Sequence, residues 1–371
     1  MLASRLERYI FRRNLRMFLL VMLVITSIIW LVDTIEQIRT IGTRAELSLA
    51  EAIYLSALKL PMLIEQILPF TLLIAAILAY RQMSLQAELI VIRASGLSAW
   101  RFLSPICILA GLVGLITMMV ISPLGANLAK QFENERAQLL NQEKTNISAT
   151  DAGLWMSEGD AHLQRIIHAK SMDATGNQLR DVKIFEERRG DAKSVSTGSM
   201  IKRRLNAEQA TLEKGSWKLE TVREIYPDQS TITYSQMSLQ TELRPDDLMD
   251  GFLKPRTVTF WSLPDFIRRF QLSGLDATPY QLRWYGLITL PVLFAAMALI
   301  GALAGLRLAR LGNIAVQAGF ALSAGLILFV SLEITKSLAL NGLVAVWLAA
   351  WIPPLLGALS CLLLLAYRED G

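Results

Sequence analysis

The sequence predicts a membrane protein with six transmembrane helices and an all-β domain inserted between the third and the fourth helix. Its 371 residues are 53% hydrophobic yet 19% charged, a balance that fits a membrane region joined to one soluble domain. Six apolar runs approach the roughly 20 residues that a spanning helix needs. The region between the third and fourth runs instead alternates polar and apolar residues. We therefore divide the chain into residues 1–124, 125–262 and 263–371.

The apolar runs form one group of three near each end of the chain. The first run follows five arginines and lacks a small-residue cleavage site, which favours a retained helix over a signal peptide. The second run contains Pro61 and Pro69, which predict kinks. It also contains Lys59 and Glu65, for which interfacial snorkelling and a polar pathway both remain open. The six runs are approximately Met17–Val32, Ile53–Tyr80, Phe102–Ser122, Tyr285–Leu306, Ile314–Lys336 and Leu343–Tyr367.

Positive charge predicts the orientation of these helices. Arginines precede the first run and follow the second, fourth and sixth runs, whereas the opposite short loops hold few basic residues. Because cytoplasmic loops are rich in Lys and Arg, both termini are expected in the cytoplasm and the inserted domain outside. In a Gram-negative bacterium that compartment is the periplasm. The flanking residues on the predicted inner side include Arg81, Arg93, Arg101, Arg307, Arg310 and Arg368.

The inserted region begins with a polar helix, Ala126–Asn141, and continues as short alternating segments. The run WKLETVREIY is expected to place one set of residues on one face of a strand, namely Trp217, Leu219, Thr221, Arg223 and Ile225. Alternation broken by glycines indicates an antiparallel β domain, either a sandwich or an open roll. The expected strands are His162–Ala169, Asp181–Glu187, Met200–Leu212, Ser216–Tyr226 and Thr231–Leu243.

Several kinds of chemistry have no signal in this sequence. It holds no phosphate-binding P-loop and no nucleophile-elbow or zinc-protease motif, so we expect no catalytic residues. Cys107 and Cys361 lie in apolar runs and predict no disulfide framework. His162 and His168 lack further ligands nearby, so no metal site is expected. Dispersed basic residues without interleaved aromatics argue against nucleic-acid binding.

The segment between the second and third runs predicts a short helix with two apolar faces, about residues 84–95. Ser84 is its expected N-cap and Gly96 its expected stop. Leu85, Leu89 and Ile92 share one face, and Glu88 lies at the edge of that face. A carboxylate on such a face favours docking into a basic socket on a second protein. A bland interfacial helix is the alternative, although Arg93 is the one basic residue that would suit it.

The segment QAELIVIRASGLS, residues 86–98, resembles the cytoplasmic coupling helix of the LptF/LptG permeases of the lipopolysaccharide exporter. The preceding LPMLIEQILPFTLLIAAILAYRQ, with its two prolines, resembles the second span of that family. The likeness extends to RYIFRR near the start and to the three-plus-three arrangement of spans. Within the family, LERYIFRR, LVDTIEQIRTIG and DAGLWMSEGD are more similar to LptG than to LptF.

The resemblance implies a permease subunit that extracts lipopolysaccharide from the inner membrane and passes it to a periplasmic β-jellyroll bridge. It implies an LptF-like partner permease, an LptB-like ATPase dimer, and LptC- and LptA-like periplasmic proteins. ATP and Mg²⁺ would then bind to the ATPase, with no cofactor on this chain. The inserted domain would be β-jellyroll-like. Glu88 matches the coupling-helix glutamate that contacts the ATPase; the coupling set is Leu85, Glu88, Leu89, Ile92, Arg93 and Gly96.

Lipid A carries phosphates, so its site needs basic groups at the outer interface as well as an apolar wall. The candidate phosphate contacts are Arg39 and Arg44 after the first span, and Lys130 and Arg136 on the polar helix. The family often has a Lys near the outer end of the first span, where this chain has Trp30 and Leu31. Snorkelling remains the alternative reading for each basic residue.

Two further functional readings remain open at this point. The chain could be the LptF-type partner rather than the LptG-type subunit. It could also be a mechanotransmitting subunit that relays ATPase cycling to a periplasmic protein without carrying lipid. Glu333 and Lys336 in the fifth span could form a gating pair, but we favour an interfacial ion pair one helical turn long.

Overall fold

A computed structural model describes most of the chain and divides it into two compact units. Unit 1 comprises residues 1–140, 259–261 and 281–371, and unit 2 comprises residues 141–258 and 262–280. The description covers residues 5–42, 47–88, 98–139, 146–150, 153–159, 163–172, 178–188, 200–213, 215–226, 230–241, 254–272, 276–306 and 314–369.

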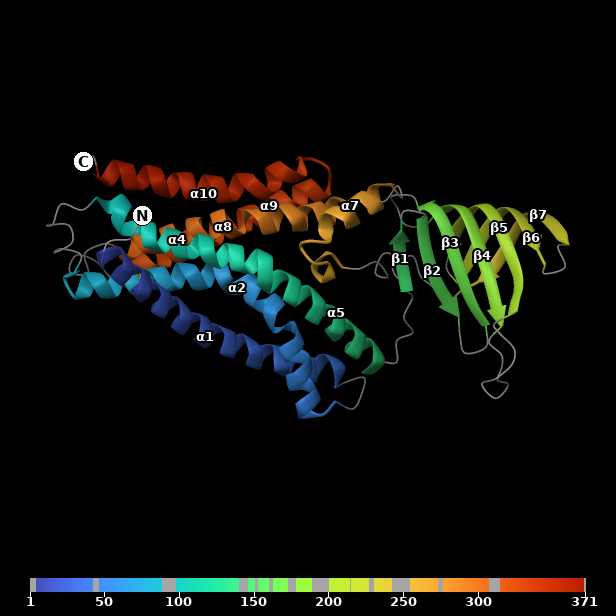
Figure 1. The fold of residues 1–371 in the computed structure, drawn as a ribbon, viewed down its shortest axis with the longest axis horizontal. Helices are drawn as coiled ribbons and strands as arrows, with labels where there is room; N and C mark the ends of the chain where they lie inside the picture. Colours follow the sequence, from blue (N-terminus) through green and yellow to red (C-terminus); the bar gives the residue numbers. More distant parts are fainter. Residues whose placement is uncertain are drawn as a thin grey trace. The chain divides into compact units, whose positions relative to one another are not determined.

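Unit 1 is a bundle of long helices, and both chain ends lie at the same end of it (Figure 1). Six helices in the described residues are long and apolar enough to cross a membrane, which confirms the predicted number of spans. The helices are α1 (Arg5–Ile41), α2 (Leu49–Leu85), α4 (Ala99–Ile116), α8 (Thr278–Gly305), α9 (Ile314–Leu340) and α10 (Val346–Glu369).

Helix α2 lies at the centre of the bundle core. It starts with a capping box in which Ser48 and Glu51 each bond the other's backbone N–H. Its later half is almost wholly buried and packs against α8, where Gly305 brings the two backbones close together. A side chain at Gly305 would meet the Ile77 carbonyl oxygen at 2.8 Å, so glycine is needed for this approach.

The third span continues well beyond its apolar run. Helix α4 passes through a five-residue π-helical turn, η1 (Thr117–Ile121), directly into α5 (Ser122–Leu139). The predicted polar helix of residues 126–141 is therefore the end of the third membrane helix. Because of this continuity, the β-containing unit begins at residue 141, whereas the sequence placed the boundary at 125.

Unit 2 contains one antiparallel sheet whose seven strands follow one another in sequence order, β1 to β7 (Figure 1). This order is the meander of an open roll, with no second sheet stacked on it among the described strands. The five predicted strands are present; β1 and β2 were missed. The strands are β1 (Asn146–Thr150), β2 (Gly153–Gly159), β3 (Leu163–Met172), β4 (Gln178–Arg188), β5 (Met200–Glu213), β6 (Ser216–Ile225) and β7 (Thr231–Gln240).

A crease crosses the sheet and reverses the alternation of its strands. Asp181 in β4 and Thr221 in β6 have positive φ angles, of 48° and 52°. The strand pairing skips both residues together with Glu208, which lies opposite each of them, while the register of the strands stays the same on the two sides of the crease. In β6 the buried positions are Trp217 and Leu219 before the crease and Val222 and Glu224 after it. The expected single face for residues 217, 219, 221, 223 and 225 is therefore wrong beyond Leu219.

Unit 2 also contains the segment that follows the sheet. It includes a short 3₁₀ turn, η2 (Pro255–Thr257), and the amphipathic helix α7 (Leu263–Leu272). Phe266 and Phe270 of α7 pack against Tyr280, with ring centroids 4.7 Å apart in both pairs. The helical segment expected from Pro264 onward is thus present, and its aromatic face is covered within the unit.

Candidate functional site

Glu88 lies just past the end of α2, at a sharp turn of the backbone. Helix α2 ends at Leu85 and Gln86 is its C-cap, so Ser84 belongs to the last turn of α2 and is not the N-cap of a new helix. Ala87 has a φ of 59°, which is uncommon for a residue with a side chain. The helical path of α2 therefore stops before Glu88.

The Glu88 carboxylate is held by residues of α1. Nη1 of Arg13 donates to both carboxylate oxygens, at 2.7 and 2.8 Å, and the Tyr9 hydroxyl donates to Oε1 at 3.1 Å. Nη2 of Arg13 donates to the side-chain oxygen of Gln86. Arg13 therefore hydrogen-bonds to the residues on both sides of Ala87. The Glu88 side chain remains 29% exposed, whereas Arg13 is 14% exposed.

A second ion pair ties the same part of α1 to the third span. Nε of Arg101, near the start of α4, donates to Oε1 of Glu7 at 2.8 Å. With 37 residues, α1 is about 55 Å long, well beyond the roughly 30 Å of a hydrocarbon core. Its first turns are therefore free to extend past the bilayer and contact the corner formed by α2 and α4.

The structure describes two of the six predicted coupling residues. Leu85 is 59% exposed at the end of α2, and Glu88 sits at the corner described above. The remaining four positions of the set, Leu89, Ile92, Arg93 and Gly96, lie outside the described residues. The two apolar faces of the predicted helix thus stay a prediction. Sequence analysis did not link Glu88 with α1, because the two segments are 75 residues apart.

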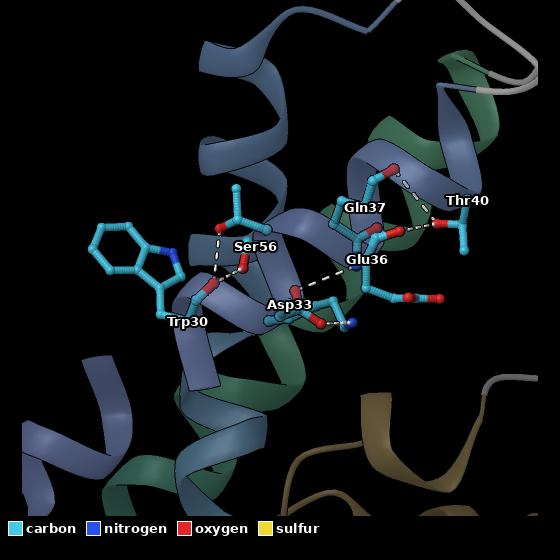
Figure 2. Close-up of polar contacts among 8 residues, drawn as sticks. Trp30, Asp33, Glu36, Gln37, Thr40 and Ser56 are labelled. Atoms are coloured by element: carbon cyan, nitrogen blue, oxygen red, sulfur yellow. Dashed lines mark hydrogen bonds and ion pairs between the residues drawn. The ribbon is translucent and has the colours of Figure 1, made fainter. Parts of the chain in front are cut away.

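A polar cluster joins the C-terminal part of α1 to the N-terminal part of α2, away from the Glu88 corner (Figure 2). Nζ of Lys59 lies 2.5 Å from Oδ1 of Asp33, and Gln37 donates to Oδ2 of Asp33 at 3.3 Å. The hydroxyl of Ser56 reaches the backbone carbonyl of Trp30 at 3.4 Å. Lys59 also lies 5.4 Å above the Phe132 ring of α5. Lys59 is thus directed at other helices, which differs from the interfacial snorkelling considered from the sequence.

The structure describes three of the four candidate phosphate contacts. Arg39 is highly exposed and pairs with Glu36 of its own helix at 3.2 Å. On α5, Lys130 is exposed and Arg136 is half-buried, while Arg44 lies outside the described residues. An apolar contact of α1, α2 and α5 brings these helix ends together, formed by Ile41, Leu55, Leu58 and Phe132.

Glu65 forms a different kind of contact, inside the helix bundle. Nη2 of Arg283 on α8 donates to one of its oxygens at 2.8 Å, and Nη1 contacts the other. Arg283 Nη2 also donates to the Ser122 hydroxyl at 3.2 Å, just after the π-helical turn. The two charged side chains are 11% and 19% exposed. Glu65 therefore links the two three-helix halves of the chain and does not snorkel.

The concave side of the β sheet contains a chain of four charged residues. Glu186 accepts from Arg165 at 2.9 Å and from Arg203 at 2.6 Å, and Arg203 also donates to Glu224 at 2.8 Å. Burial would raise the pKa of Glu186, but the hydrogen bonds from the two arginines outweigh it and hold that pKa below its usual value. Arg165 also reaches the Gln240 carbonyl of β7, so the sheet is strongly rolled.

The remaining candidate sites give little indication of a function. Within the described parts of the chain, no group of three or more His, Cys, Asp and Glu residues is placed to hold a metal ion. Cys107 and Cys361 are free thiols. Lys336 pairs with Glu333 on the same helix at 2.7 Å, a contact that both the gating pair and the interfacial pair considered from the sequence would make.

Comparison with known proteins gives one consistent result. A family model described as lipopolysaccharide export system permease LptF/LptG matches residues 8–367. The LptG permease protein of Escherichia coli K12 is 24% identical over 363 residues, covering 95% of this chain and 93% of the relative. The LptG protein of Haemophilus influenzae is 23% identical over 308 residues, covering 81% and 80% of the two chains.

Proposed function

Since the chain belongs to the LptF/LptG family of lipopolysaccharide export permeases, we propose that it is the LptG-type permease subunit of an ABC transporter. In this role it extracts lipopolysaccharide from the inner membrane and passes it to a periplasmic β-jellyroll bridge. The observation that carries the proposal is the reach of the family match, which spans all six membrane helices and the β unit in a single alignment. The similarity to proteins named LptG favours that branch over LptF.

The proposed orientation has both termini in the cytoplasm and the β unit in the periplasm. Both chain ends lie at the same end of the bundle, where the arginine-rich start of α1 is found (Figure 1), and Glu88 contacts Arg13 of that same part of α1. Basic residues of this kind favour the cytoplasmic side. The ends of α1 and α2 that carry Lys59 and Asp33 then face the periplasmic leaflet.

We assign the coupling to ATP hydrolysis to the corner around Glu88. The exposed Leu85 and the partly exposed Glu88 offer an apolar and an acidic contact to a separate ATPase dimer, which binds ATP and Mg²⁺. A Glu88→Lys variant is expected to insert in the membrane and to lose the ATPase on co-purification. Full ATPase recovery and normal transport with this variant would argue against the assignment.

Lipid contact is proposed at the periplasmic ends of α1, α2 and α5 and in the β unit. Arg39, Lys130 and Arg136 supply positive charge there, and Lys59 adds another within the polar cluster. The inner face of the β roll offers apolar residues for acyl chains. LptF-, LptC- and LptA-like proteins would complete the path.

Site-specific photocrosslinking in the assembled transporter tests the lipid path. A photoreactive residue at Ile35 of α1, Ile334 of α9 or Met237 of β7 is expected to capture lipopolysaccharide. Tyr367, which is 84% exposed at the cytoplasmic end of α10, serves as the control position and should capture none. Silence at all three test positions would overturn lipid carriage and favour a mechanotransmitting subunit instead.

A further inference from the structure

Because a turn separates Glu88 from α2, this helix does not fix the orientation of the Glu88 side chain. The helix stops at Leu85, and Ala87 adopts a left-handed backbone angle that L-residues with a side chain rarely take. Leu85 at the end of α2 and its C-cap Gln86 are exposed and provide little packing. Among the described residues, the contacts that hold the Glu88 side chain come from α1.

We infer that Arg13, with the help of Tyr9, is a positioning residue for Glu88, so that the first turns of α1 act as a brace for this side chain. This inference rests on the proposed function. One Arg13 nitrogen holds both Glu88 oxygens and the other holds Gln86, so a single guanidinium fixes the residues on either side of Ala87. A planar guanidinium suits this double contact, whereas a lysine ammonium does not reproduce it.

The brace leaves room for a partner. A carboxylate offers about four acceptor directions, and here Arg13 takes two and Tyr9 takes one. The side chain of Glu88 is still 29% exposed. An incoming basic or hydrogen-bonding group from the ATPase can thus be added without displacing Arg13. The Arg101–Glu7 pair keeps the same part of α1 in place by an independent contact.

The test uses the assembled transporter with its ATPase, reconstituted in lipid with lipopolysaccharide. Arg13→Ala is expected to lower the ratio of lipid transported to ATP hydrolysed by about tenfold, the equivalent of one charged hydrogen bond. Arg13→Lys should show most of that loss, and the KM for ATP should stay unchanged. Arg12→Ala is the matched control, since it removes the same charge from an exposed neighbouring position.

A double-mutant comparison separates positioning from general destabilisation. If Arg13 acts through Glu88, Arg13→Ala should change little in a Glu88→Ala background, which has no acceptor for Arg13, whereas independent effects would multiply. A wild-type transport ratio in Arg13→Ala, or full multiplication of the two effects, overturns the inference. Should Arg13→Ala fail to accumulate, Tyr9→Phe and Arg13→Lys give the same comparison, and wild-type ratios in both would overturn it.

The outcomes for the proposed function remain distinguishable. If Glu88→Lys loses the ATPase while Arg13→Ala transports normally, the coupling role stands and the brace fails. If Glu88→Lys itself leaves assembly and transport intact, the coupling role fails, whatever Arg13 does.

Discussion

Two arginine–glutamate pairs join distant parts of unit 1, but in different surroundings. Arg283 and Glu65 meet inside the bundle, where both are mostly enclosed and a third helix adds Ser122. Arg13 and Glu88 meet at the end of the bundle, where the glutamate is more exposed and follows a strained turn. The chemistry of the two pairs is the same, so burial and backbone context decide what each one does.

The comparison suggests a division between holding and coupling. An enclosed pair is costly to break because either partner alone would be a buried charge. A pair at a polar edge contributes little to stability, since water can replace either partner. Glu65 is therefore expected to hold the two halves of the chain together, whereas Glu88 remains available to a second protein.

The largest expected effect comes from removing Glu65. Glu65→Ala leaves Arg283 unpaired inside the bundle and should lower the free energy of unfolding by about 3–5 kcal/mol. Unfolding of the purified protein in mild detergent, titrated with a denaturing detergent, would measure this. Replacing both residues by methionine should restore most of the loss. If Glu65→Ala alone lowers the free energy of unfolding by less than about 1 kcal/mol, the Arg283–Glu65 pair contributes as little to stability as the more exposed Arg13–Glu88 pair.

The charged chain in the β sheet extends the comparison to an enclosed network in unit 2. Hydrogen bonds from the arginines outweigh burial and keep the pKa of Glu186 below its usual value. Its stabilising contribution is therefore present at neutral pH and is lost as the pH falls below the ordinary glutamate range. Hydrogen exchange of β4–β6 in the full chain should accelerate from about pH 6 to about pH 3, after correction for intrinsic rates. Unchanged protection over this range would mean that the arginines do not lower the pKa of Glu186.

Glu88→Gln should separate stability from coupling. We expect the free energy of unfolding to change by less than about 1 kcal/mol, because the pair is partly exposed and the amide still accepts from Arg13. ATP hydrolysis by the assembled transporter should nevertheless fall, because this variant removes the acidic contact proposed for the ATPase. A large loss of stability without a change in hydrolysis would reverse the roles assigned to the two pairs.

The smallest effects are expected for the exposed pairs within single helices. Arg39→Ala and Lys336→Ala should each alter the free energy of unfolding by about 0.5 kcal/mol or less. Their functional effects should differ, because Arg39 is a proposed phosphate contact and Lys336 is not. Crosslinking of lipopolysaccharide from Ile35 should decrease in the Arg39 variant and stay at the wild-type level in the Lys336 variant.

The sequence predicted the elements that depend on local pattern. Apolar runs identified the six spans, and alternation identified five strands. It failed where the backbone departs from its period without a glycine to mark the place, as at Asp181 and Thr221. A prediction based on strict alternation therefore placed the side chains of the second half of β6 on the wrong face of the sheet.

Hydrophobic periodicity reports on local structure and cannot predict ion pairs between residues that are far apart in the sequence. Glu88 and Glu65 were noticed as unusual charges, but their partners are 75 and 218 residues away. Arg283 stands just before an apolar run, and the sequence pattern does not mark it as the partner of Glu65. The positions of Leu89, Ile92, Arg93 and Gly96 in a coupling helix stay predictions from sequence.

Helix α1 has a mechanical consequence for these sites. Its 37 residues include neither glycine nor proline, whereas α2 contains two prolines. Such a helix has no residue that marks a sharp kink. Ion pairs hold it near both ends, through Arg13 on one side and Asp33 on the other. A straight helix held in this way transmits a displacement along its length, so a shift of Arg13 is expected to move Asp33 as well.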